Sequence, residues 1–230
     1  MGTLWPVTIV NGRDAGSLLE RRLFATGAIV VAGVDEVGRG AWAGPLTVGV
    51  ALVSLANLRR LPEGVRDSKL LSAQQRERLF PFLAESLLGY AVGHASAEEC
   101  DELGMTAAQR LASVRAFDAV GRESDAVVVD GKFEFTGHPR ARCVVGADRI
   151  SVVVAAASVL AKVTRDRLMV DASPSYPAYR FESNKGYPSP DHVAALAAGG
   201  LSPIHRRSWS FAANYGVRRF RGEEGAHPRL

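Results

Sequence analysis

Three separate segments of the sequence place carboxylates directly after a run of apolar residues. These are Asp35 and Glu36 after 29–34, Asp130 after 126–129, and Asp148 after 144–146. A carboxylate at the end of a buried strand is costly when it is desolvated and unpaired, so it calls for a cation. An all-oxygen donor set without Cys or His favours Mg²⁺ or Mn²⁺ over Zn²⁺. Two such ions can activate a water and stabilise the leaving oxygen of a phosphodiester.

Each acid also has a plainer interpretation. Asp130 could equally cap a helix or turn, and Asp148 could cap a helix that begins near Ser151. The cap interpretation is weak for Asp35 and Glu36, because two adjacent acids follow a fully apolar run. Neighbouring side chains on a strand point to opposite faces, so this pair can share one metal only if the backbone turns there. The glycines that follow would allow such a turn. Two further aspartates are interpreted as cap or turn residues, namely Asp67 and Asp191.

The hydrophobic pattern predicts the elements that must position these acids. Continuous apolar or β-branched runs predict strands at 29–34, 46–53, 90–95, 126–129 and 142–145. The first two should pair as antiparallel neighbours, because only a short loop joins them. Helical spacing predicts helices at 73–88, 97–103, 106–120 and 151–170, and a short one near 191–198. This order predicts an α/β fold with a mixed central sheet.

Composition is that of an ordinary globular protein. The chain has 230 residues, of which 47% are apolar and 23% charged, and a formal net charge of +4. The sign of that charge favours a polyanionic partner over an acidic protein surface. No signal-peptide pattern opens the chain, and the longest apolar run, 152–161, is too short to span a bilayer. We therefore expect a cytoplasmic protein without membrane association, whose two cysteines are buried thiols.

Residues 38–43, GRGAWA, formally match the G-x-G-x-x-A fingerprint of dinucleotide-binding proteins. The context that the fingerprint requires is missing, because Pro45 and a strand follow where a helix N-terminus should receive the pyrophosphate. Flexible glycines around an arginine, next to a carboxylate pair, suit close approach of the backbone to a nucleic-acid strand instead.

Several motifs, in order along residues 32–210, resemble those of bacterial ribonuclease HII, a type 2 ribonuclease H. They are AGVDEVGRG at 32–40 with AGP at 43–45, DSKL at 67–70, VDG at 129–131, the small-residue segment 155–163, RDR at 165–167, KGY at 185–187 and the segment 203–206. Two positions depart from the family pattern. Trp42 replaces a smaller residue, and Asn184 stands where many relatives carry histidine. Neither touches the four acids, although both could alter substrate preference.

The resemblance implies a ribonuclease H-like fold and a role for each motif residue. The fold is a mixed central sheet flanked by helices, divided into an N-terminal segment 1–28, a catalytic core 29–172, a helical C-terminal extension 173–217 packed on the core, and a tail 218–230. The metal-binding and catalytic acids would be Asp35, Glu36, Asp130 and Asp148. The ribose 2′-hydroxyl would be contacted by Gly38, Arg39 and Gly40, and the sugar of the next nucleotide by Tyr187. Phosphate contacts would come from Lys69, Lys162, Arg165 and Lys185.

The implied activity is endonucleolytic hydrolysis of the RNA strand of RNA/DNA hybrids, with cleavage 5′ of single ribonucleotides in duplex DNA. It would use Mn²⁺ or Mg²⁺, leave 3′-hydroxyl and 5′-phosphate ends, and serve ribonucleotide and primer removal by a monomer. Two alternatives are a non-catalytic RNA/DNA-binding module on this fold and a DNA-directed two-metal nuclease that ignores the 2′-hydroxyl. At the level of single residues, Lys162 could instead form an intrahelical ion pair with Asp166. Tyr187 could be an ordinary packing residue.

Overall fold

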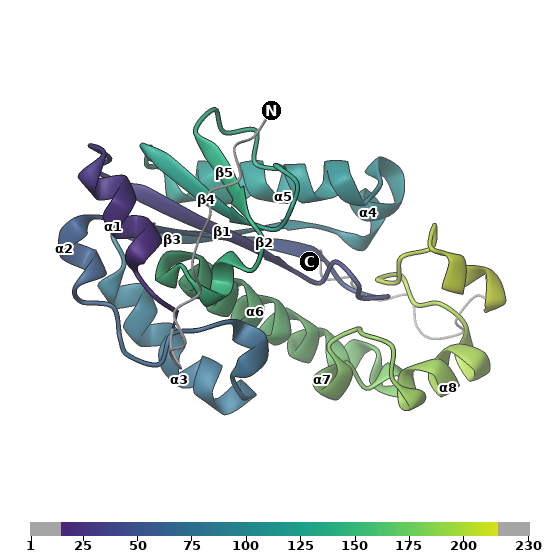
Figure 1. Cartoon of the computed structure of the whole chain (residues 1–230). Coiled ribbons are helices and arrows are strands. Elements are labelled where there is room, and N and C mark those ends of the chain that lie inside the picture. Colours follow the sequence, from purple (N-terminus) through teal and green to yellow (C-terminus); the bar gives the residue numbers. More distant parts are fainter. Residues whose placement is uncertain (1–14, 216–230) are drawn as a thin grey trace.

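A five-stranded mixed sheet forms the centre of the protein (Figure 1). The computed structural model describes residues 15–215. The strands are β1 (Val31–Val37), β2 (Leu46–Val53), β3 (Gly89–Ala95), β4 (Ala126–Asp130) and β5 (Ala141–Val144), in the order β3-β2-β1-β4-β5. β2 is antiparallel to β1 and to β3, whereas β4 is parallel to β1 and to β5. The predicted mixed sheet and the antiparallel pairing of the first two strands are therefore confirmed.

Helices cover both faces of the sheet. On one face lies the long helix α6 (Val152–Ala172), with α3 (Ala73–Ser86) packed against it. The other face carries α5 (Met105–Val120), preceded by α4 (Ala97–Leu103). Each face buries its own apolar cluster, because side chains alternate between the two faces along every strand. The predicted helices are thus present, with ends that differ by a few residues.

The first half of α6 lies unusually close to the sheet. Its residues from Val152 to Ala161 are all buried, and Ser151 caps the helix by accepting a hydrogen bond from the backbone N–H of Val154. A Cβ on Gly33 of β1 would lie only 2.4 Å from the backbone carbon of Val153. Glycine and small helix residues therefore set the spacing between β1 and α6, and with it the position of the charged second half of the helix.

The chain after α6 forms a compact helical segment against the β1–β2 loop. It contains α7 (Phe181–Asn184), α8 (Pro190–Gly199) and three short 3₁₀ turns, Ser173–Ser175, Pro177–Tyr179 and Ser210–Asn214. Its apolar cluster includes Ala43 from the loop and Met169 from α6. Trp42 of the loop stacks on Phe211, with ring centroids 4.2 Å apart. This packing holds the β1–β2 loop beside the residues that follow α7.

A few sequence-based expectations need adjustment. The helix near 191–198 is capped by Ser189, so Asp191 lies in its first turn and is not the cap. Three short helices were not predicted, namely α1 (Leu18–Ala25), α2 (Leu55–Leu58) and α7. Both cysteines are free, but only Cys100 is fully buried; Cys143 is half-buried. Within residues 15–215, no helix is both long and apolar enough to cross a membrane. The tail assigned to 218–230 lies outside the described residues.

Candidate active site

The predicted acids meet at one edge of the sheet. β4 pairs with β1 only as far as Val34 and Val129, so Asp35 and Asp130 follow directly after the last pair of residues. Asp148 lies in a 3₁₀ turn, Ala147–Arg149, and the backbone N–H of Ala147 donates a hydrogen bond of 2.7 Å to Asp130. Two parallel strands and the turn before α6 therefore deliver carboxyls to the same place.

No backbone turn separates Asp35 from Glu36, so the turn that would let both side chains share one metal is absent. β1 continues as a regular strand along β2, with Asp35 opposite Gly49 and Glu36 opposite Val48. β4 pairs with β1 only up to Val34, so it does not cover the edge of β1 at Asp35 and Glu36. Asp35 points to the α6 side, where it is buried and hydrogen-bonded to Ser158, whereas Glu36 is half-buried.

Burial and mutual repulsion make these carboxyls difficult to ionise together. Burial raises the pKa of Asp35 from its ordinary 3.8 to about 8, and the charges of the other three acids add to the effect. Burial also raises the pKa of Asp148 to about 6, again with a contribution from Asp130. Burial and the charge of Asp130 likewise raise the pKa of Glu36. Ionising these carboxyls together at neutral pH therefore costs free energy.

A bound divalent cation would offset the repulsion between these carboxylates. Their oxygen donors suit a hard cation. Within residues 15–215, no group of three or more His, Cys, Asp or Glu side chains forms a preassembled metal site. Three of the acids instead have hydrogen-bond partners from the protein: Asp35 bonds to Ser158, Asp130 accepts from the N–H of Ala147, and Asp148 bonds to Asp67. The chemistry of the donors fits a metal, and the carboxyls are held by neighbouring groups in this conformation.

Asp67 is a site residue that sequence reasoning missed. As expected, it caps the turn that follows it, accepting a hydrogen bond of 2.9 Å from the backbone N–H of Lys69. It is also buried, and its carboxyl is hydrogen-bonded to that of Asp148. The DSKL motif contains this aspartate, two residues before the lysine that is predicted to contact phosphate.

A cavity of about 420 Å³ joins two of the acids, Asp35 and Glu36, to the residues expected to bind substrate, whereas Asp130 and Asp148 do not line it. Its lining comprises Asp35, Glu36, Val37, Gly38, Arg39, Gly40, Ser68, Lys69, Lys162 and Tyr187. Burial lowers the pKa of Lys69, but four surrounding carboxyls, Asp35, Asp67, Asp148 and Asp130, outweigh it and raise that pKa overall. The cavity therefore presents cations beside carboxylates, as an enzyme acting on a phosphodiester requires.

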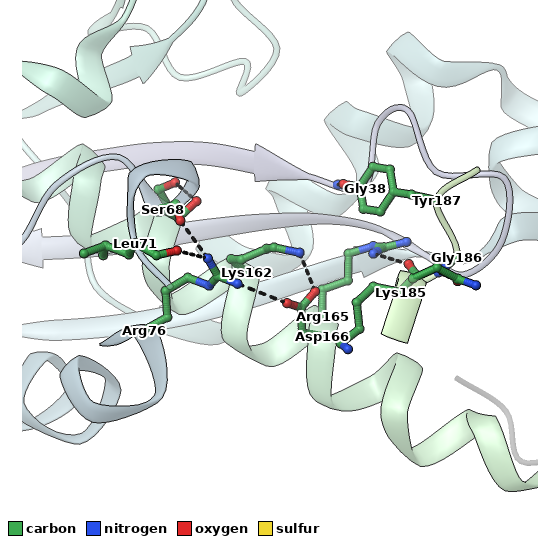
Figure 2. A network of polar contacts seen from close by, with 12 residues as sticks. Gly38, Ser68, Leu71, Arg76, Lys162, Arg165, Asp166, Lys185, Gly186 and Tyr187 are labelled. Carbon is green, nitrogen blue, oxygen red and sulfur yellow. Dashed lines mark hydrogen bonds and ion pairs between the residues drawn. The ribbon is translucent and has the colours of Figure 1, made fainter. Parts of the chain in front are cut away.

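Tyr187 closes the cavity next to the glycine–arginine–glycine loop. Its hydroxyl accepts a hydrogen bond of 3.1 Å from the backbone N–H of Gly38, as Figure 2 shows. One face of the ring is within reach of Lys162, whose Nζ lies 5.6 Å from the ring centroid. Both Arg39 and Gly40 are exposed at the mouth of the cavity. Tyr187 is thus placed between the loop and α6, where a bound sugar could reach it.

Two buried arginines hold the β1–β2 loop through its backbone carbonyls. Arg165 has no exposed surface and donates hydrogen bonds of 2.8 to 3.0 Å to the carbonyls of Pro45, Ala43 and Lys185. Arg206, equally buried, donates to the carbonyls of Gly38, Arg39 and Gly44. Arg206 was missed as a site residue, although the segment that contains it was noted.

The predicted phosphate contact by Arg165 is not compatible with this arrangement. Its guanidinium is enclosed and already bonded to three carbonyls, so a phosphate would have to displace them. Lys185 is also absent from the lining of the cavity. It lines a neighbouring pocket of about 280 Å³ with Arg76 and Arg167, and its ammonium group donates to the carbonyl of Glu182. Lys69 and Lys162 therefore remain the two predicted phosphate contacts that line the cavity.

His192 and His205 are buried residues that bond to each other. Their Nε2 atoms are 2.8 Å apart, and Nδ1 of His205 bonds to Ser202. They lie in the C-terminal segment and have no place in the cavity.

Comparison with known proteins identifies the family. The family model described as Ribonuclease HII matches residues 32–212. The chain belongs to the ribonuclease HII family. The ribonuclease HII of Streptomyces avermitilis is 53% identical over 195 residues, which cover 84% of this chain and 82% of that protein. The crystal structure of the ribonuclease H2 from Pyrococcus horikoshii OT3 is 34% identical, with a TM-score of 0.70 over 81% of this chain and 96% of that one. A structure of Bst-RNase HIII in complex with Mn²⁺ is 21% identical, with a TM-score of 0.67 over 82% of this chain and 70% of that one, and it shares the fold.

Ribonuclease HII enzymes cleave RNA in RNA/DNA hybrids, and membership of the family makes this chain a ribonuclease H endonuclease. The expected ribonuclease H-like fold is likewise confirmed by the structural relatives.

Proposed function

We propose that the protein cuts the phosphodiester on the 5′ side of a ribonucleotide, both in RNA/DNA hybrids and where a single ribonucleotide is embedded in duplex DNA. The products are a 3′-hydroxyl and a 5′-phosphate. The observation that carries this proposal is the shared cavity, in which Asp35 and Glu36 adjoin the Gly38–Gly40 loop and Tyr187. Acids for hydrolysis and a surface for recognising ribose therefore line the same cavity.

The loop supports recognition of a 2′-hydroxyl through its backbone. Arg206 holds the carbonyls of Gly38 and Arg39, and Tyr187 takes the N–H of Gly38. Among residues 15–215, no acceptor takes the N–H of Gly40, and no atom lies within 4 Å of where its Cβ would be. An exposed amide in open space can donate to a ribose hydroxyl, the group that distinguishes RNA from DNA.

The four acids Asp35, Glu36, Asp130 and Asp148 would hold Mg²⁺ or Mn²⁺. When bound, these ions supply activation of the attacking water and stabilisation of the charge that develops on the leaving 3′ oxygen. The residues of the chain would position the substrate. Lys69 and Lys162 place the phosphates, and the loop and Tyr187 hold the sugar, so that the scissile bond stays over the acids.

A duplex with one ribonucleotide tests the proposal. The labelled duplex is compared with an all-DNA duplex of the same sequence, in Mg²⁺, in Mn²⁺ and in EDTA. A metal-dependent cut immediately 5′ of the ribonucleotide, with the all-DNA duplex intact, is the expected result. Cleavage of the all-DNA duplex would establish a DNA-directed nuclease instead. Tight binding without cleavage in either metal would establish a binding module.

We further propose that the enzyme acts as a monomer in the cytoplasm, where it removes ribonucleotides and RNA primers from DNA. Sedimentation at working concentration tests whether the protein is a monomer, and a dimer would be the contrary result. An alkali-sensitivity assay of chromosomal DNA from cells that lack the protein tests the second, and DNA no more sensitive than that of the parent would refute it.

A further inference from the structure

We propose that Asp166 is a positioning residue. From outside the cavity, it fixes the positions of the two lysine-bearing arms of the cavity wall relative to each other. One arm is Lys162 on α6. The other is the turn Ser68–Leu70, which carries Lys69. This inference rests on the proposed function, because it assigns a role to Asp166 in placing the phosphates of that substrate.

The first arm is held directly. Lys162 donates a hydrogen bond of 2.6 Å from Nζ to Oδ1 of Asp166, one helical turn further along α6. Both side chains are mostly shielded from solvent, with 19% and 14% of their surfaces exposed. Burial lowers the pKa of Lys162, and the carboxylate of Asp166 counteracts that effect. Asp166 therefore restricts Lys162 to one orientation and supports its charge at the wall of the cavity.

The second arm is held through Arg76 of α3. The Nη2 atom of Arg76 lies 3.7 Å from Oδ2 of Asp166. Its Nη1 atom donates to the carbonyls of Ser68 and Leu71, at 2.8 and 2.5 Å, and so clamps the turn at both ends. The hydroxyl of Ser68 is in turn 2.8 Å from that of Ser158, the residue bonded to Asp35. Figure 2 shows this continuous set of contacts from α6 through Arg76 to the turn.

The position of Asp166 is difficult to explain by binding alone. A carboxylate next to Lys162 partly cancels the positive charge that attracts a polyanion. Electrostatics by itself therefore predicts that removing the charge of Asp166 would tighten binding of a duplex. An ordinary i,i+4 pair that only supported the helix would not need Arg76, nor a link to the turn on the other side of the cavity. Geometric control of the two lysines accounts for both features.

The test separates binding from cleavage in Asp166→Asn. Duplex affinity is measured in EDTA with the single-ribonucleotide duplex, and cleavage is measured in Mn²⁺ under single-turnover conditions with excess enzyme. We expect affinity equal to that of the wild type or higher, together with a cleavage rate that is lower by about 10- to 100-fold. Unchanged cleavage would overturn the proposal. Parallel losses of binding, cleavage and thermal stability would make Asp166 merely structural.

Glu77→Gln is the matched control, because it makes the same chemical change in a neighbouring ion pair. Glu77 bonds to Arg167, the residue after Asp166, and both side chains are about half exposed. Neither residue lines the cavity. This variant should cleave at the wild-type rate. A loss equal to that of Asp166→Asn would mean that any change of surface charge here is harmful, and would refute the specific role.

Two further variants keep the proposal falsifiable if Asp166→Asn folds poorly. Arg76→Gln should slow cleavage although Arg76 does not line the cavity, because it releases the turn that carries Lys69. In a Lys162→Gln background, Asp166→Asn should cost less than it does in the wild type, since part of its action passes through Lys162. No effect of Arg76→Gln, or equal losses in both backgrounds, would contradict the account. A wild-type protein that fails to cleave would refute the proposed function, and this inference with it.

Discussion

Substituting Gly40 by alanine separates folding from substrate recognition. Apart from Gly40 itself and its two chain neighbours, no atom of the described chain lies within 4 Å of the position that a Cβ on Gly40 would take, and its φ lies outside the left-handed region. Nothing in the protein itself therefore requires glycine at this position. Replacing such a glycine by alanine stabilises a protein by about 0.4–1 kcal/mol, because the unfolded chain loses freedom. For a chain of this size we expect the Tm to rise by about 1–4 °C.

Cleavage should respond in the opposite direction. The added methyl group would occupy the space from which a ribose approaches the Gly40 amide. A lost neutral hydrogen bond costs about 0.5–1.5 kcal/mol, and displacement of the sugar moves the scissile phosphate away from the acids. We therefore expect kcat/KM for the single-ribonucleotide duplex to fall by at least about tenfold, equivalent to about 1.4 kcal/mol.

Gly38→Ala is the contrasting variant. Gly38 has a φ of +83°, and a Cβ there would lie 2.2 Å from Nε of Arg165 and 2.7 Å from the carbonyl oxygen of Pro45. This variant should lose both stability and activity. Thermal unfolding and steady-state cleavage of all three proteins provide the comparison. A Gly40→Ala protein with full activity would show that no substrate group approaches this amide, and would refute the assignment of the loop.

Three other substitutions and a salt titration give further predictions. Asp130→Asn should abolish cleavage but leave duplex binding in EDTA within a fewfold of wild type; equal loss of both would make Asp130 structural. Because burial raises the pKa of Asp35 from 3.8 to about 8, the native protein retains a proton that the unfolded chain has lost, so this carboxyl should reduce stability progressively as the pH rises through that window. Asp35→Asn should therefore raise the Tm in EDTA at pH 8 more than at pH 5, and a pH-independent change would contradict the shift. Arg206→Met removes the guanidinium donor from the carbonyls of Gly38, Arg39 and Gly44, at about 1–3 kcal/mol for a buried carbonyl left unsatisfied, so its Tm should fall clearly, and an unchanged Tm would show that the guanidinium does not hold the loop. Duplex affinity should fall as salt is raised and vary little with base sequence, and a strong sequence preference in binding assays would contradict backbone recognition.

The sheet and its helices could be predicted because their residues are buried in regular patterns. The run 46–53 matches β2 residue for residue, and 97–103 matches α4. The nearly all-apolar run at the start of α6 likewise indicates a buried helix. By contrast, α1 has only eight residues, and its place against the core depends on tertiary contacts such as those of Glu20 with Ser151 and Val153.

Parts of the site depended on contacts that a single sequence cannot show. Arg165 was expected to bind phosphate because it is a cation in a motif, but the carbonyls of Ala43, Pro45 and Lys185 meet around it only in the folded chain. The sequence left open how Asp35 and Glu36 are presented, for a similar reason. Their accessibility depends on where β4 stops, and no local feature of β1 reveals that point.

The most direct test of the central claim is the chemical identity of the cleaved ends. A duplex with one ribonucleotide, labelled separately at each end of the cut strand, is digested in Mn²⁺ and the products are mapped at single-nucleotide resolution. The account predicts a cut 5′ of the ribonucleotide that leaves a 3′-hydroxyl extendable by a polymerase and a 5′-phosphate removable by a phosphatase. A 2′,3′-cyclic phosphate on the ribonucleotide, with a 5′-hydroxyl on the other fragment, would show that its own 2′-hydroxyl is the nucleophile. That result would contradict hydrolysis at the four acids.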